Sequence, residues 1–177
     1  MTVRVDIGGL IQHAVRLRAT ARQVSALKQR AVGTLRRRMP VAARRDIQQE
    51  YAISASRVNE GVRTTNIDGG IVIQGSGRGV GLIQFGARQT RKGVTYLVRR
   101  GKRELQEGAF IAKVRGKPHV FVRAKSGGKR VARLPIERQF RLSIAQMLRR
   151  PDRRDRIGKA AEEIMAAEVE RLIRTLR

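Results

Sequence analysis

The chain has no cysteine and no tryptophan, and only two tyrosines and four phenylalanines, so aromatic residues make up 3% of the sequence. The lack of cysteine excludes disulfides, thiolate nucleophiles and cysteine-ligated zinc, so stability has to come from packing or assembly. The scarcity of rings argues against a surface on which nucleic-acid bases stack. The phenylalanines lie in apolar runs or stripes, and we assign all of them to the core: Phe85, Phe110, Phe121 and Phe140.

Long hydrophobic runs are missing too. No stretch of about 18 uncharged apolar residues could span a bilayer. The N-terminus carries Asp6 and no apolar run of signal-peptide length, so we expect a soluble protein that is not exported by the Sec pathway. With 177 residues, the chain has room for one ordinary domain, which we place at 1–177.

Acidic residues are also scarce, with 14 Asp and Glu against 40 Lys and Arg, which gives a formal net charge of +26. Residues 1–60 carry +8, residues 61–137 carry +13 and residues 138–177 carry +5. Such self-repulsion opposes compaction and predicts an anionic partner. Because 41% of the residues are hydrophobic and periodically spaced, we expect a folded basic protein rather than a disordered tail.

The first sixty residues predict helix. Apolar residues recur at spacings of three and four, interrupted where Lys28 takes a position in the stripe: Leu10, Ala14, Leu17, Ala21, Val24, Ala31 and Leu35. Pro40 should end this helix near Arg38 and kink or restart it, with Val41, Arg44, Ile47 and Tyr51 on one face of the continuation. Ser54 or Ser56 could then cap a short helical turn ending near Gly61.

From Arg63 the pattern changes to short β-branched runs separated by glycine and basic residues, which predicts a central antiparallel sheet over 61–135. The predicted strands are 71–73, 82–85, 94–98 and 119–122, and the predicted turns are 75–79, 86–93, 99–103 and 125–130. A helix is predicted from Ile136 to Leu148, broken by Pro151. A last helix carries an apolar stripe, with Glu168/Arg171 and Glu170/Arg174 as charge pairs: Ile157, Ala161, Met165, Val169, Leu172 and Leu176. The predicted class is therefore α+β, with β structure between two helical segments, 1–60 and 136–177.

Enzyme-like arrangements are weak, so we expect no catalytic residues, no bound metal and no cofactor. His13 and His119 lie on different predicted elements, and one imidazole alone does not make a site. Glu162 and Glu163 are adjacent on a helix and point in different directions, as Glu104 and Glu107 do in a predicted loop. The alternating glycines of 75–81 match neither a dinucleotide fingerprint nor a phosphate loop.

The predicted turns concentrate the positive charge of the middle segment. The chain is rich in arginine but shows no element that would recognise base edges. We therefore expect it to contact nucleic-acid phosphates irrespective of the base sequence, or to contact an acidic protein. The candidate contact residues are Arg88, Arg91, Lys92, Arg99, Arg100, Lys102, Arg103, Lys113, Arg115 and Lys117. For packing within or between subunits, the candidates are Leu10, Leu17, Val24, Leu35, Val169, Leu172 and Leu176.

Residues 108–148 carry a family resemblance. Gly108-Ala109-Phe110-Ile111 is followed by residues 116–123 (GKPHVFVR), a Gly-Lys turn, and Leu134-Pro135-Ile136-Glu137 before Phe140. This segment resembles minor tail protein Z of lambda-like phages and prophages, tail-completion proteins with an arginine-studded N-terminal helix and a basic C-terminal helix. The resemblance covers most of the chain in layout and about forty residues in motif.

The resemblance implies a structural virion protein at the head-proximal end of the tail, needed for tail maturation and head–tail joining and lying near the viral DNA end. It implies tail terminator and tail tube proteins and head-completion or connector proteins as partners. It also implies a homo-oligomeric ring, which sixfold tail symmetry favours as a hexamer, located in the virion after assembly in the host cytoplasm.

Two other function classes stay open. Basic charge alone equally supports a free, sequence-nonspecific nucleic-acid-binding protein, which should bury its apolar stripes within the monomer, whereas a neck subunit should leave helical surfaces for its neighbours. A nuclease would need clustered carboxylates or histidines, which the sequence does not offer at metal-ligand spacing.

Overall fold

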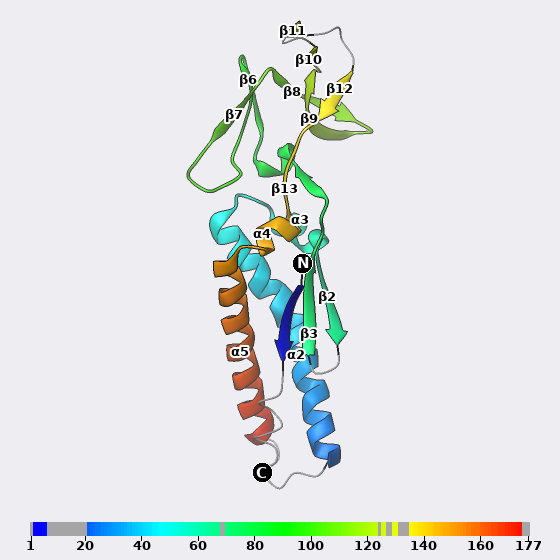
Figure 1. Ribbon diagram of the computed structural model, residues 1–177, viewed down its shortest axis with the longest axis vertical. Coiled ribbons are helices and arrows are strands. Elements are labelled where there is room, and N and C mark those ends of the chain that lie inside the picture. Colours follow the sequence, from blue (N-terminus) through cyan, green and yellow to red (C-terminus); the bar gives the residue numbers. More distant parts are fainter. Residues whose placement is uncertain are drawn as a thin grey trace.

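The computed structural model describes residues 2–6, 21–67, 70–123, 125–126, 129–130 and 135–174. The molecule is elongated, with a helical half and a β-rich half stacked along its long axis (Figure 1). Antiparallel sheets combine with a long helix, α2, near the start of the chain and with two helices at its end, which confirms the predicted α+β class.

Helix α2, Ala21–Glu50, buries one stripe of residues spaced four apart: Leu27, Ala31, Leu35, Met39, Ala43 and Ile47. Because four residues turn an α-helix by about 400°, this stripe rotates by about 40° at each step. One helix can therefore pack against α5 and also against β2, β3, α3 and α4. The predicted interruption of the stripe at Lys28 is wrong, because the inward position belongs to Leu27.

The predicted break at Pro40 is also wrong in one respect, because α2 runs through it as a single helix. Pro40 cannot donate a backbone hydrogen bond, which costs a helix interior about 3 kcal/mol. Met39 and Ala43 are fully buried on either side of it. Their packing offsets the local cost, so tertiary contacts override the propensity of the proline.

Short elements join α2 to a three-stranded sheet. Helix α3, Ala55–Gly61, begins at Ser54, whose hydroxyl accepts a hydrogen bond from the Arg57 backbone N–H and confirms the predicted cap. Strand β3, Gly70–Gly75, lies between β1, Thr2–Asp6, and β2, Val62–Ile67. Strand β1 contradicts the prediction that residues 1–60 are helical. Both faces of β3 are covered, which matches its continuous Ile-Val-Ile run.

The predicted single central sheet is divided among several small sheets. Strands β5 (Arg88–Thr90), β6 (Gly93–Tyr96) and β7 (Glu104–Glu107) form one of them. Strands β8 (Ala109–Val114), β9 (Lys117–Arg123) and β12 (Ile136–Arg138) form another. Strand β4 (Gly79–Gly81) pairs with β13 (Phe140–Ser143), and β10 (Lys125–Ser126) pairs with β11 (Lys129–Arg130).

The predicted strand at 82–85 is a 3₁₀ helix, η1, Leu82–Phe85. Leu82 and Phe85 are both fully buried. A strand would direct residues three apart to opposite faces, whereas a 3₁₀ turn places them on the same side. The need to bury both side chains in one core decides the conformation.

The predicted helix from Ile136 to Leu148 is helical only in α4, Ile144–Leu148. Residues before it form β12 and β13, because their backbone hydrogen bonds go to β9 and β4. Phe140 is consequently 45% exposed, which overturns its assignment to the core. Ser143 and Gln146 form a reciprocal capping box that starts α4 at the end of β13.

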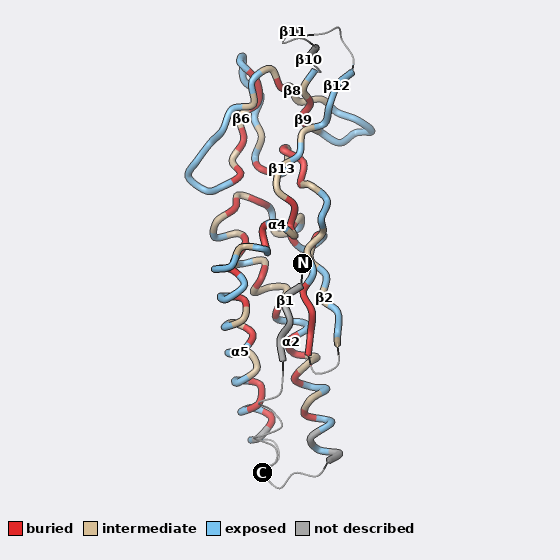
Figure 2. Tube along the Cα trace, in the orientation of Figure 1, coloured by how far each residue is buried: buried red, intermediate tan, exposed pale blue. Residues whose placement is uncertain are grey.

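Helix α5, Pro151–Arg174, begins at the proline that was predicted to break the preceding helix. Its predicted stripe is confirmed at Ile157, Ala161, Val169 and Leu172, which are buried, and at the partly buried Met165. The predicted pairs of Glu168 with Arg171 and Glu170 with Arg174 are both present. Figure 2 shows buried residues along β3 and the inner sides of α2 and α5, while the hairpin turns are exposed.

Candidate functional site

The predicted basic contact residues are distributed over three connections in the β-rich half. Arg88, Arg91 and Lys92 lie on β5 and the β5–β6 turn. The second group, at 99–103, occupies the connection from β6 to β7, and the third, at 113–117, surrounds the β8–β9 turn. These connections project from different sides of the β-rich half (Figure 1). The structure therefore does not gather the candidates into one patch.

Three of the candidates attach the β6–β7 connection to the rest of the fold. The Nε of Arg100 donates to the Gln48 carbonyl oxygen over 2.6 Å, and its backbone N–H donates to the Glu50 carbonyl oxygen over 2.8 Å. Arg99 forms an ion pair with Glu50 at 3.3 Å. The Nη1 of Arg103 donates to Thr95 Oγ1 over 3.2 Å. Arg99 and Arg100 bind the C-terminal end of α2, where backbone carbonyls favour cations.

The remaining candidates have no such role. Within the described part of the chain, their exposed side chains form no hydrogen bond or ion pair: Arg88, Arg91, Lys92, Lys102, Lys113, Arg115 and Lys117. Arg115 also has a positive φ of 50°, followed by Gly116 at 75°, which makes the β8–β9 connection a two-residue turn of the type that favours Asn-Gly. An arginine in a left-handed conformation is strained, and such strain is concentrated at functional positions.

The predicted packing residues that the structure describes serve packing within one chain. Leu35, Val169 and Leu172 are buried in the interior where α2 and α5 lie together. The backbone of Val24 lies in α2. Leu10, Leu17 and Leu176 lie outside the described residues, as does His13.

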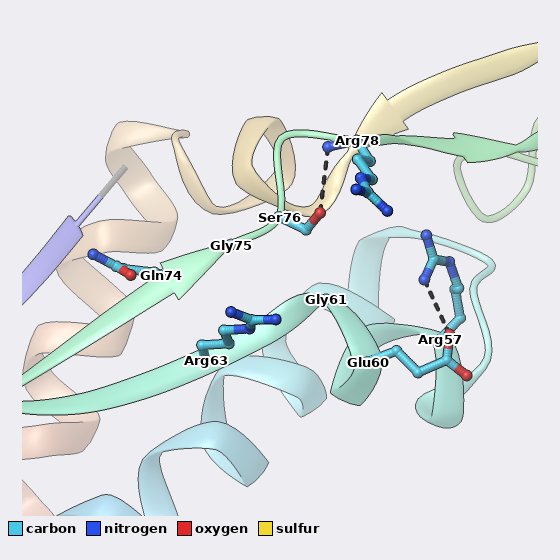
Figure 3. Close-up of a pocket in the computed structure, with 8 residues that line it drawn as sticks. All are labelled: Arg57, Glu60, Gly61, Arg63, Gln74, Gly75, Ser76 and Arg78. Atoms are coloured by element: carbon cyan, nitrogen blue, oxygen red, sulfur yellow. Dashed lines mark hydrogen bonds and ion pairs between the residues drawn. The ribbon is translucent and has the colours of Figure 1, made fainter.

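A cleft lined by arginine, of about 430 Å³, lies where α3, β2 and the end of β3 meet, and no sequence pattern predicted it. Figure 3 shows the guanidinium groups of Arg57, Arg63 and Arg78 around the same hollow. Arg57 donates to Glu60 over 3.0 Å. The side chains of Arg63 and Arg78 form no hydrogen bond or ion pair with any residue that the structure describes.

Two glycines that line this cleft pack closely against α4. A Cβ on Gly61 would lie 2.6 Å from the Ile144 side chain, and one on Gly75 would lie 2.7 Å from the Ala145 backbone nitrogen. Gly75 and Gly79 therefore allow close packing of α4 and β13, whereas a Cβ on Gly81 would make only an ordinary contact with the Arg138 side chain and Gly77 has open space. With two unpaired guanidinium groups, the cleft can bind a phosphate or carboxylate group.

A network of carboxylates and arginines joins α2 to α5 beside a second cleft of about 610 Å³. Arg153 is fully buried and pairs with Asp46 and, at 2.9 Å, with Glu50. Burial by itself raises the pKa of Asp46, but hydrogen bonds from Arg156 and Arg153, and their charges, lower it below its ordinary value. Asp46 and Glu50 are engaged with arginine, so we assign this network to stability.

The other possible catalytic groups do not converge. Glu104 and Glu107 lie on β7 and not in a loop, and the Tyr96 hydroxyl donates to Glu104 over 2.9 Å. Glu162 and Glu163 are exposed on α5. Burial and the charges of Arg138 and Lys117 lower the pKa of His119. Among the described residues, no group of three or more His, Asp or Glu is arranged to hold a metal ion.

Comparisons of this chain with protein-family models, with curated proteins and with solved structures give no match. Among the described residues, no helix is both long enough and apolar enough to cross a membrane.

Proposed function

We propose that this chain is a structural protein of a tailed-phage virion, a tail-completion subunit at the head-proximal end of the tail. Its role would be tail maturation and head–tail joining, close to the viral DNA end. The observation that carries the proposal is a set of exposed cations on the connections of the β-rich half that no carboxylate neutralises. In the helical half, Asp46, Glu50 and Glu168 pair with arginines, while other arginines there, such as Arg63 and Arg154, form no ion pair within the described chain. On the connections of the β-rich half, the cations at 88–92 and 113–117 form no ion pair within the described chain.

An unneutralised basic end favours assembly onto an anionic neighbour, either DNA or an acidic ring protein. Most of the resembling segment, 108–148, lies in this half: the β8–β9 hairpin and β12 belong to it, and β13 leads from it to α4 in the helical half (Figure 1). Large apolar side chains also remain exposed on the strands there, at Leu105, Val114, Ile136 and Phe140. A homo-oligomeric ring, with a hexamer favoured, would bury such residues between subunits together with tail terminator or connector partners.

The test is deletion of the gene from the phage or prophage that encodes it, followed by electron microscopy and mass spectrometry of the particles. We expect free, filled heads beside unjoined tails that lack this chain, and rescue by the wild-type gene. As a matched pair, Lys92→Gln with Arg115→Gln should impair rescue, whereas Arg154→Gln with Lys159→Gln on α5 should not. Normal infectious particles after deletion would refute the proposal.

The second candidate is a free, sequence-nonspecific nucleic-acid-binding protein. One observation favours it: the described apolar stripes of α2 and α5 are buried inside a single chain and do not leave helical surfaces for neighbours. Native mass spectrometry separates the candidates, because a neck subunit should form a ring or join purified tails. A chain that stays monomeric, never joins particles and binds DNA would establish the alternative.

A further inference from the structure

The sheet β8–β9–β12 has two unlike faces. Directly paired residues of antiparallel strands lie on the same face, so the register assigns every side chain to one side. One face carries Ala109, Ile111, Val120 and Val122, which are buried or packed against the core. The opposite face, here called the ring face, carries Phe110, Ala112, Val114, Lys117, His119, Phe121, Arg123, Ile136 and Arg138.

The ring face combines aromatic and cationic side chains and holds no acidic residue. The Phe110 and Phe121 ring centres are 6.0 Å apart, and His119 meets Phe121 edge-on at 6.2 Å. Phe121 is buried between its neighbours, while Phe110 and His119 are half-buried. Three of the few rings of this chain therefore form one strip on two adjacent strands, with accessible rings at both ends.

Cations flank this strip at stacking distance. The Arg123 guanidinium lies 5.4 Å from the centre of the Phe110 ring, and the Arg138 guanidinium lies 4.9 Å from that of Phe140, which is itself 45% exposed. Lys117 is exposed at the start of β9. Because the pKa of His119 is lowered, its imidazole is neutral at neutral pH and acts as a flat ring and not as a charge.

We propose that the ring face binds single-stranded nucleic acid. Unpaired bases stack on Phe110, on His119 and on the guanidinium planes, and Lys117, Arg123 and Arg138 contact the phosphates. A duplex keeps its bases stacked inside and could use only the cations. An acidic protein segment would likewise leave the rings unused. This binding mode replaces the phosphate-only contact expected from the low aromatic content, and it does not depend on the phage role.

The test compares three labelled ligands by fluorescence anisotropy at fixed salt: oligothymidylate, an abasic strand of equal length, and a duplex. We expect the oligothymidylate to bind more tightly than the abasic strand. A strand carrying 2-aminopurine should show quenched fluorescence when bound to the wild-type protein, because its base stacks on a ring. This measurement needs no variant and is unaffected by any folding defect.

The variants separate rings from charges. Phe110→Leu with His119→Leu keeps the apolar volume, removes both accessible rings and should weaken oligothymidylate binding at least about tenfold, since stacking contributes about 1–3 kcal/mol per base. Binding of the abasic strand should not change. Arg123→Gln should lower the salt slope by about 0.7, because one phosphate of the single strand is no longer neutralised. Arg154→Gln, on α5 in the helical half, is the charge-matched control and should leave both the 2-aminopurine signal and the effect of the ring variant unchanged.

Equal affinity for the oligothymidylate and the abasic strand, with no 2-aminopurine quenching, would overturn the proposal. The proposal would also be overturned if the protein bound the duplex more tightly than oligothymidylate and kept this preference in the Phe110→Leu, His119→Leu variant. That result would indicate contact with phosphates alone. Binding of a polyglutamate peptide, but of no nucleic acid, would assign the face to an acidic protein. None of these results bears on the tail-completion role, which particle assembly tests separately.

Discussion

Replacement of Arg153 by methionine is the most informative test of what holds the helical half together. This side chain is fully buried, and its guanidinium pairs with Asp46, donates to Glu50 over 2.9 Å and donates to the Met147 carbonyl oxygen over 2.6 Å. It also lies 5.3 Å from the centre of the Tyr51 ring. Methionine fills a similar apolar volume but leaves the carboxylates and the carbonyl without this partner.

The loss of unfolding free energy depends on the ion pairs that Asp46 and Glu50 keep after the substitution. Removing one partner of a buried ion pair costs about 3–5 kcal/mol. Asp46 keeps Arg156 at 2.5 Å, and Glu50 keeps Arg99 and Arg150, so we expect the lower end, about 3 kcal/mol. For a chain of this size, each kcal/mol lowers Tm by about 2–4 °C, which predicts a fall of roughly 6–12 °C.

Urea and thermal unfolding followed by circular dichroism would measure both quantities. Arg154→Met on the same helix is the matched control, because Arg154 is exposed and its side chain forms no hydrogen bond or ion pair with the described chain. It should leave Tm unchanged. If Arg153→Met and Arg154→Met changed Tm equally, the reasoning would be refuted, because the buried network would then contribute no more to stability than an exposed arginine.

Further predictions test the pH dependence, the glycine packing, the basic connections and the absence of catalysis. The folded-state pKa values of Asp46 and Glu168 lie below their ordinary values, so their stabilisation should be complete above about pH 5 and lost as titration proceeds below about pH 4. Gly75→Ala places a Cβ 2.7 Å from the Ala145 backbone and should lower unfolding free energy by about 1–3 kcal/mol, whereas Gly77→Ala, in open space, should not. Replacing Arg91 and Lys102 with Gln should reduce the salt slope of duplex DNA binding without changing Tm. Replacing Arg99 and Arg100 with Gln should lower Tm, because these two side chains hold the β6–β7 connection on α2. Pure protein incubated with plasmid and divalent metal should leave the DNA intact, and cleavage that follows the protein through a column would contradict this.

The sequence alone determined the features that depend on local pattern. Apolar residues spaced three and four apart predicted the two long helices, α2 and α5, and Ser54 was predicted as a helix cap. These signals act within one or two helical turns. The β-branched run at 71–73 gave β3 for the same reason. The α+β class and the intrahelical charge pairs of α5 follow from such short-range patterns.

Tertiary contacts decided the rest. The helix continues through Pro40 because Met39 and Ala43, the stripe residues on either side of it, are buried. Residues 82–85 form a 3₁₀ helix because this conformation buries Leu82 and Phe85 on the same side. Strand partners are chosen by distant backbone, so the division into small sheets and the conversion of 136–143 to strands had no local signal. The arginine cleft and the ring face likewise join residues far apart in sequence, because register and close glycine packing, which composition does not encode, place them together.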